Sequence, residues 1–83
     1  MDRSEIEEKI RKVFAENLSV PEDRVTMESR FQEDLDADSL DLYELVMELE
    51  DTYGISVSEE EAADIETVGD AVDFVAGRLG VAA

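Results

Sequence analysis

The sequence predicts an all-α protein: a four-helix bundle in a single domain over residues 1–83, with a short third helix and a long loop between the first two helices. Three observations support this fold class. A capping residue or motif precedes each expected helix, and apolar residues recur at helical spacing behind it. The β-branched residues Ile55 and Val57 are too few and too isolated to form a sheet. Eighty-three residues suffice for one hydrophobic core but not for two.

The first helix is expected over residues 4–17. Ser4-x-x-Glu7 has the capping-box pattern, in which a hydroxyl and a carboxylate each satisfy a free backbone N–H of the first turn. Arg11 and Lys12 place positive charge in the C-terminal half, where the helix dipole favours it. The apolar residues that should face the core are Ile6, Ile10, Val13, Phe14 and Leu18.

Residues 18–38 are expected to form a long irregular connection, because Pro21, Thr26 and Ser29 interrupt any regular period. A loop of this length inside a compact domain needs a reason. Here it can carry the chain along the bundle, so that the first two helices pack without being tight hairpin neighbours. Its apolar anchors are Val20, Val25, Met27, Phe31 and Leu35.

The second helix should begin at Asp38 and Ser39, with Asp38 as the N-cap, and end at Tyr53 before Gly54. A helical wheel divides it into three sectors. The sector expected to face the core contains Leu42, Leu45, Val46, Leu49 and Tyr53. An acidic sector on nearly the opposite side contains Asp41, Glu44, Glu48 and Asp51. A third, apolar sector borders the acids and contains Leu40, Tyr43 and Met47.

The third sector of that helix has two interpretations. An apolar strip beside an acidic stripe suits a docking surface, in which charge steers a partner and the apolar side chains contact it. The same strip would also suit a helix wedged between two others and buried on both flanks. The wheel does not distinguish the two.

The third and fourth helices are also marked by capping boxes. Ser58-x-x-Glu61 begins a short helix over about residues 59–64, and Thr67-x-x-Asp70 begins the fourth. The fourth should end at Gly80. Its apolar side contains Val68, Ala71, Val72, Val75 and Leu79.

The net charge of −17 is distributed unevenly. Residues 1–30 hold six basic and eight acidic side chains, whereas residues 31–77 hold sixteen acidic side chains and no basic one. Such a field repels phosphate backbones and anionic lipids, so neither nucleic acid nor membrane insertion is expected. Proteins with basic patches are the favoured partners. A solubilising face with no partner is the alternative.

The composition also restricts the chemistry. Cysteine and histidine are absent, which excludes disulfides, thiolate metal sites and the commonest general base. The acids are expected on exposed helix surfaces rather than in a cleft that could separate their pKa values, so we do not expect an enzyme. The N-terminus does not have the pattern of a signal peptide, and no apolar run is long enough to span a membrane, so a cytoplasmic protein is expected.

A calcium loop is one interpretation of the acidic run before the second helix. Asp34, Asp36 and Asp38 have the spacing of the first three EF-hand ligands. That loop also needs Gly at its sixth position and Glu at its twelfth, where Ser39 and Leu45 stand. We therefore expect no metal site.

The beginning of the second helix carries a family resemblance. The tract resembles the attachment motif of the acyl carrier proteins in Asp38-Ser39-Leu40, Asp41, Glu44-Leu45-Val46 and Met47. Similar residues continue on both sides, in Phe31-x-Glu33-Asp34-Leu35, Glu59-Glu60-Glu61-Ala62 and Thr67-Val68. The resemblance covers nearly the whole chain and is weakest in the N-terminal helix. It implies a single acyl-carrier domain.

The resemblance implies that Ser39 carries a 4′-phosphopantetheine arm, attached by a phosphopantetheinyl transferase (a holo-acyl-carrier-protein synthase) from coenzyme A. The thiol of the arm would hold acyl groups as thioesters for acyltransferases, ketosynthases, reductases and dehydratases with basic patches. Type II fatty acid synthesis is the expected pathway, and a specialised polyketide or lipid-modification pathway is the alternative. The chain is expected to be a monomer. If Ser39 were only a helix-capping serine, the protein would instead be an acidic interaction module without a prosthetic group.

The family also suggests roles for the neighbouring residues. With the wheel, it indicates a partner-binding face of Asp38, Leu40, Asp41, Tyr43, Glu44, Met47, Glu48 and Asp51. Glu50 matches a family docking acid, but the wheel places it away from the others. The resemblance implies that an acyl chain would be sheltered by Leu42, Val46, Leu49, Ala62 and Ile65, for which ordinary core packing is the alternative.

Two residues depart from the family pattern. Asp36 stands where Gly is most common, and Asp is among the few other residues that tolerate a positive φ. Tyr43 replaces what is commonly a small aliphatic or β-branched residue. Either change could alter which partners dock.

Overall fold

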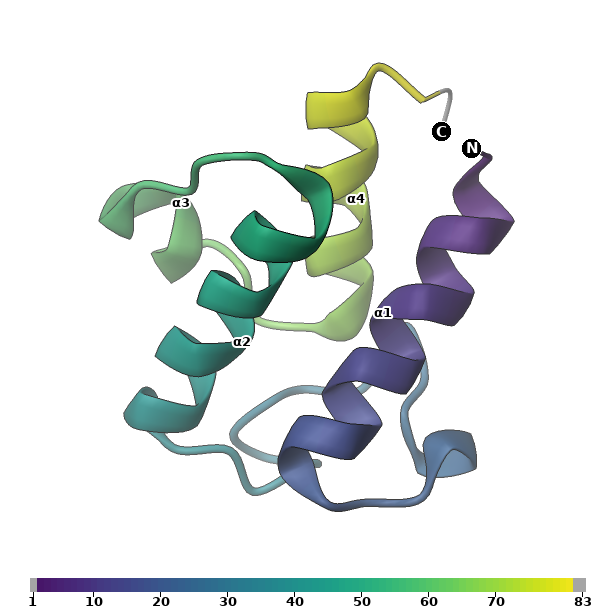
Figure 1. Cartoon of the computed structure of the whole chain (residues 1–83). Helices are drawn as coiled ribbons and strands as arrows, with labels where there is room; N and C mark the ends of the chain where they lie inside the picture. Colours follow the sequence, from purple (N-terminus) through teal and green to yellow (C-terminus); the bar gives the residue numbers. More distant parts are fainter. Residues whose placement is uncertain (1, 82–83) are drawn as a thin grey trace.

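Helices form all the regular structure of residues 2–81, the part of the chain that the computed structural model describes, so the predicted fold class is confirmed (Figure 1). The elements are α1 (Arg3–Leu18), the 3₁₀ turn η1 (Glu22–Arg24), α2 (Ser39–Tyr53), α3 (Glu59–Ala63) and α4 (Val68–Leu79). Within the same residues, the extended backbone pairs only in an isolated antiparallel bridge between Arg30 and Thr67. None of these helices combines the length and the apolar character needed to cross a membrane.

The core is built around α1, which contacts both α4 and α2. Its predicted apolar stripe is buried at Ile6, Ile10 and Phe14, whereas Val13 and Leu18 are only partly buried. Phe14 packs edge-to-face on Phe31 of the long connection, with ring centroids 5.3 Å apart. The buried residues that face this stripe from α2 and α4 are Leu45, Leu49, Val68, Ala71, Val72, Val75 and Ala76.

The start of α1 differs from the prediction. The N-cap is Asp2, whose carboxylate accepts a hydrogen bond from the Glu5 N–H at 3.0 Å, so the predicted capping box of Ser4 and Glu7 is wrong. Asp caps a helix as well as Ser does, and starting earlier brings Arg3 into the first turn, where it pairs with Asp73 of α4 at 2.6 Å. The local cap and a tertiary contact therefore favour the longer helix.

The other three helix starts agree with the sequence. Side-chain caps at Asp38, Ser58 and Thr67 each accept a hydrogen bond from the backbone of the third helical residue. That third residue is Asp41, Glu61 or Asp70, and its carboxylate accepts the N–H of the cap in return. The predicted C-caps Gly54 and Gly80 have positive φ angles of 64° and 71°. Each reciprocal pair satisfies two backbone donors, which fixes where the helix begins.

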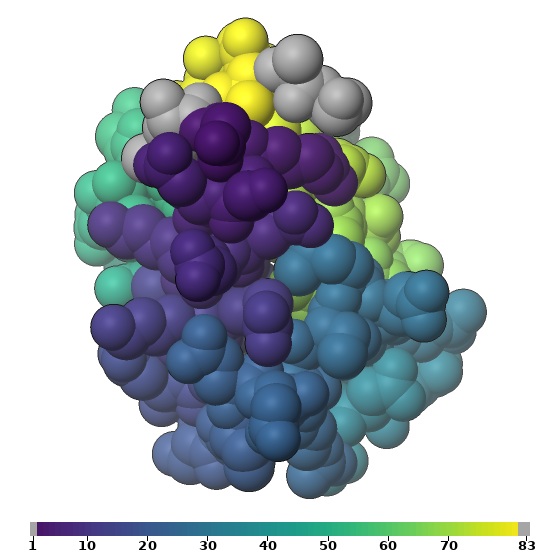
Figure 2. Space-filling model, turned by 90° about the vertical axis from the view of Figure 1, so that its right-hand side faces the viewer, coloured from purple at the N-terminus to yellow at the C-terminus, as the bar shows by residue number. Residues whose placement is uncertain are grey.

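The long connection is ordered by burial and by pairing with distant backbone. Its anchors Val25, Phe31 and Leu35 are buried, as is Ala37, which the sequence did not single out. In Figure 2 the connection (blue) packs beneath α1 (purple) and along its side. On α1, Arg11 lies in the C-terminal half of the helix, as predicted, and its Nε donates to the Val25 carbonyl at 2.9 Å.

The connection also pairs with the start of α4. The N–H groups of Val68 and Gly69 donate to the carbonyls of Ser29 and Met27 at 3.0 and 2.8 Å. Buried Ser29 turns the chain there, since its hydroxyl accepts the Thr26 N–H at 3.0 Å. This pairing explains how a loop of this length can be part of a compact fold.

Two glycines of α4 provide a matched test of this pairing. A Cβ on Gly69 would lie 2.8 Å from the Met27 carbonyl oxygen, whereas a Cβ on Gly77 would meet nothing within 4 Å. We expect Gly69→Ala to lower the free energy of unfolding by about 1–3 kcal/mol, because the backbone at Met27 and the start of α4 would have to move apart. Gly77→Ala should raise it by about 0.5–1 kcal/mol through helix propensity. Urea denaturation of both variants measures the difference, and equal effects would contradict the close approach.

Candidate functional site

Ser39 is the first residue of α2 and is exposed. Its hydroxyl makes no hydrogen bond within residues 2–81, and the N–H groups of Ser39 and Leu40 find no acceptor there. The next N–H, that of Asp41, is already taken by the Asp38 carboxylate at 2.9 Å. The hydroxyl is therefore accessible beside two free donors at the positive end of a helix, an arrangement that favours an attached anion.

The carboxylates closest to Ser39 in sequence have structural tasks. Asp38 and Asp41 cap the helix reciprocally, and the Asp41 carboxylate accepts the Asp38 N–H at 3.2 Å. The remaining predicted acids, Glu44, Glu48 and Asp51, are exposed. No ion pair among residues 2–81 involves any of these five acids, so their charge is not neutralised within the described fold.

The third sector of α2 is exposed to solvent. Leu40 is 65% exposed, Tyr43 64% and Met47 46%, which excludes the interpretation that neighbouring helices bury this strip. Large apolar side chains at such exposure, next to unpaired carboxylates, form a surface suited to an apolar partner with a positive rim. We call the exposed residues Leu40, Tyr43, Glu44, Met47, Glu48 and Asp51 the α2 face.

An apolar cavity of about 420 Å³ lies between α2 and the segment containing α3, and Ser39 is among the residues that line it. All five residues predicted to shelter an acyl chain line this cavity: Leu42, Val46, Leu49, Ala62 and Ile65. Its volume is within the range of small-molecule sites.

The cavity corrects one part of the wheel analysis. Of the five residues expected to face the core, only Leu45 and Leu49 are buried; Leu42, Val46 and Tyr53 are half-buried. Leu42 and Tyr53 still pack against the buried core, and Leu42 and Val46 line the cavity. Tyr53 does not line it, and partial burial raises the pKa of its hydroxyl, which has no hydrogen-bond partner in residues 2–81.

Several cavity residues were missed by sequence reasoning. Phe14 and Phe31 approach from α1 and the long connection, and their apolar character alone could not distinguish a cavity wall from core. Glu50 lines the cavity and its Oε2 accepts the Val57 N–H at 2.9 Å. It is half-buried and has this structural contact, in agreement with the wheel, which separated it from the other acids. No group of three acidic side chains within residues 2–81 is arranged to hold a metal ion.

Asp36, just before the site, has a φ of 55°. The position therefore does require the left-handed conformation that Asp tolerates better than most residues. The turn it makes lets the Ala37 N–H donate to the Phe31 carbonyl at 2.8 Å. It brings the chain from the connection into the Asp38 cap.

An accessible serine at a helix tip, an acidic face with exposed apolar residues and an adjoining apolar cavity suit a carrier protein that presents a prosthetic group. The comparisons agree, since a family model described as "Phosphopantetheine attachment site" matches residues 8–75. The chain belongs to the acyl carrier protein family, whose members carry 4′-phosphopantetheine.

Individual relatives match over nearly their whole length. The acyl carrier protein of Rubrobacter xylanophilus is 55% identical over 75 residues, which cover 90% of this chain and 93% of the relative. That of Borrelia garinii subsp. bavariensis is 49% identical over 80 residues, covering 96% and 100%. A solved structure of the acyl carrier protein from Enterococcus faecalis is 40% identical, covers 93% of this chain and 98% of that one, and has a TM-score of 0.78.

The conformation of Asp36 can be tested by substitution. Asp36→Ala should lower the free energy of unfolding by about 1 kcal/mol, because Ala at positive φ is strained. Asp36→Gly should be at least as stable as Asp36→Asn and clearly more stable than the Ala variant. Thermal unfolding of the three variants provides the comparison. Equal stability of the Ala and Gly variants would show that the left-handed turn is not required.

Proposed function

We propose that Ser39 is the residue to which 4′-phosphopantetheine is attached, and that the arm carries acyl groups as thioesters in type II fatty acid synthesis. The observation that supports this most directly is an exposed hydroxyl beside two free N–H donors on the lining of an apolar cavity. Ser58 also lines the cavity, but its hydroxyl is occupied by the Glu61 N–H at 3.1 Å. Ser29 is buried.

This chain and the transferase contribute different groups to the attachment reaction. A bond forms between the Ser39 oxygen and the phosphate of the pantetheine unit, the pyrophosphate bond of coenzyme A breaks, and adenosine 3′,5′-bisphosphate leaves. The chain contributes the hydroxyl and its fixed position on α2. It has no histidine, and the Asp38 carboxylate is occupied by the helix cap. We therefore expect the base that accepts the serine proton to come from the transferase.

We propose the α2 face, together with Asp38 and Asp41, as the docking surface for the transferase and for acyltransferases, ketosynthases, reductases and dehydratases with basic patches. Its carboxylates are exposed and unpaired within the described residues, which supports electrostatic steering. The proposal includes a monomeric protein in the cytoplasm, and the net charge of −17 disfavours self-association.

The cavity residues Leu42, Val46, Leu49, Ala62 and Ile65 are proposed to shelter the acyl chain. A chain that enters there removes apolar surface from water, at about 25 cal/mol per Å². Because Ser39 lines the same cavity, the arm begins next to the place where its cargo would lie.

A specialised polyketide or lipid-modification pathway is the second candidate. The observation in its favour is Tyr43, a large aromatic residue that both belongs to the α2 face and lines the cavity. A partner would have to accommodate this ring at the centre of the docking strip. Tyr43 thus bears on partner choice more than on attachment of the arm.

The attachment site can be tested by mass spectrometry. Incubation with coenzyme A and a phosphopantetheinyl transferase should add the mass of one phosphopantetheine group. Ser39→Ala should abolish this gain, because within residues 2–81 no other exposed serine with an unoccupied hydroxyl lines the apolar cavity. Ser58→Ala is the control and should still gain the full mass. An unmodified wild-type protein, or a modified Ser39→Ala variant, would contradict the proposal.

Steering can be tested by charge reversal. Glu44→Lys combined with Asp51→Lys should slow association with the transferase about tenfold at low salt and weaken its salt dependence. The matched control makes the same charge change away from the α2 face, with Glu16→Lys and Glu8→Lys on α1. Stopped-flow kinetics at several ionic strengths measure both. Similar slowing by the two pairs would show that only the net charge matters.

A further inference from the structure

The α3 segment is weakly anchored by apolar packing. The helix has only five residues, Glu59–Ala63, and none of them is buried. A helix this short is not stable by itself in water. It nevertheless belongs to the wall that faces α2 across the cavity, together with Val57 and Ser58 before it and Ile65 after it. Other contacts must hold this wall in place.

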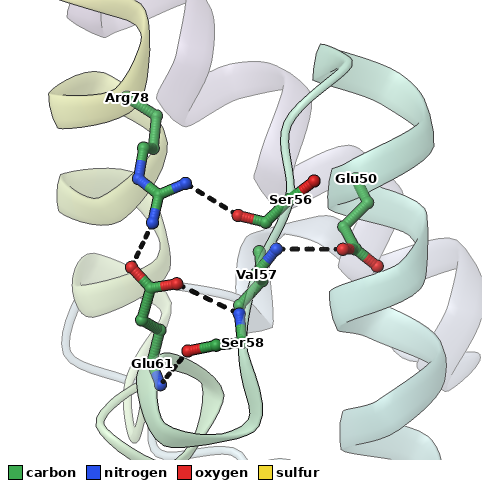
Figure 3. Close-up of polar contacts among 6 residues, drawn as sticks. All are labelled: Glu50, Ser56, Val57, Ser58, Glu61 and Arg78. Carbon is green, nitrogen blue, oxygen red and sulfur yellow. Dashed lines mark hydrogen bonds and ion pairs between the residues drawn. The ribbon is translucent and has the colours of Figure 1, made fainter.

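One guanidinium group from α4 supplies two of these contacts (Figure 3). Arg78 donates from Nη1 to the Ser56 carbonyl at 2.7 Å, and its Nη2 forms an ion pair with the Glu61 carboxylate. The same carboxylate accepts the Ser58 N–H at 3.0 Å. Arg78 therefore ties both the α2–α3 connection and α3 itself to α4.

The connection has a separate tie to α2. Figure 3 shows the Glu50 carboxylate of α2 directed at the Val57 backbone, and its Oε2 accepts that N–H at 2.9 Å. If the Arg78 contacts break, this bond still holds the connection to α2. Without Arg78, α3 itself would have no side-chain hydrogen bond to another helix within residues 2–81.

Within residues 2–81, no basic side chain other than Arg78 pairs with α3. It is the only basic residue after Arg30, in a region that holds sixteen carboxylates. Its guanidinium is held over the Phe74 ring, 4.7 Å from the centroid, which favours the orientation that reaches α3. The Ser58 backbone hydrogen bond and then Arg78 lower the pKa of Glu61, which keeps its carboxylate ionised for this pairing.

We propose that Arg78 is a positioning residue for the carrier function: it latches α3 to α4 and so sets how often the cavity between α2 and α3 opens to admit or release an acyl chain. The inference rests on the function proposed above for that cavity. Arg78 belongs neither to the attachment motif nor to the cavity lining. The inference nevertheless gives it a specific effect on the cargo. Arg78 acts through the position of Ser56, Ser58 and Glu61.

The first test measures hydrogen exchange in the unloaded protein. In Arg78→Gln, amides of residues 58–65 should exchange about five- to tenfold faster than in the wild type, while those of Ile10 and Phe14 stay unchanged. Glu61→Gln should have a similar effect, because an amide oxygen can still accept the Ser58 N–H but loses the ion pair. The double variant should exchange no faster than Arg78→Gln, since that single variant already removes the ion pair with Glu61.

A matched control breaks a different ion pair of α4. Arg3 pairs with Asp73 at 2.6 Å on the side that faces α1, and Arg3 has no contact of this kind with α3. Arg3→Gln should leave exchange in residues 58–65 as it is in the wild type. If Arg3→Gln accelerates it equally, or if Arg78→Gln does not accelerate it, the latch does not exist.

The second test follows the cargo. The protein is loaded with octanoyl-phosphopantetheine, and hydroxylamine cleavage of the thioester is timed. Arg78→Gln should be cleaved several-fold faster than the wild type and Arg3→Gln, because a chain that leaves the cavity more often exposes its thioester. Equal cleavage rates despite faster α3 exchange would overturn the proposed control of the cavity. A wild-type protein that cannot be loaded would instead contradict attachment at Ser39, while the exchange data still decide whether Arg78 holds α3.

Discussion

Packing of the apolar face of α1 against α2 and α4 is the interaction on which this fold depends. Ile6, Ile10 and Phe14 are almost fully buried in that contact. The chain they hold together carries sixteen carboxylates between residues 31 and 77, whose mutual repulsion opposes compaction. Because the apolar contacts concentrate on α1, the side of α2 that faces α3 is left with an open apolar cavity rather than a filled core. The cavity nevertheless adjoins the core, since Leu45 and Leu49 of α2 belong to both.

Short-range chemistry made most of the fold predictable. The caps at Asp38, Ser58 and Thr67 and the terminal glycines give nearly the observed helix ends, because each depends on residues within a few positions of one another. The start of α1 was not predictable in this way. Asp2 and Ser4 each stand three residues before a glutamate, and the choice between them is coupled to a contact with Asp73, some seventy residues away in sequence.

Part of the candidate site could also be predicted from the sequence. A family motif indicated Ser39, and a general rule about positive φ accounted for Asp36. The exposure of Leu40, Tyr43 and Met47 could not be derived from the wheel, because a wheel does not show which side of α2 the other helices leave uncovered. The wheel also could not predict the contacts of Glu50 and Arg78. Each of these side chains hydrogen-bonds to the backbone of the α2–α3 connection, whose position depends on the tertiary fold.

The pairing of the long connection with the start of α4 has a kinetic consequence. The carbonyls of Met27 and Ser29 meet their donors, Gly69 and Val68, only after most of the chain is present. Contacts of such sequence separation form late and carry a loop-closure cost. During synthesis, the segment that leads into Ser39 therefore settles only once α4 has emerged from the ribosome.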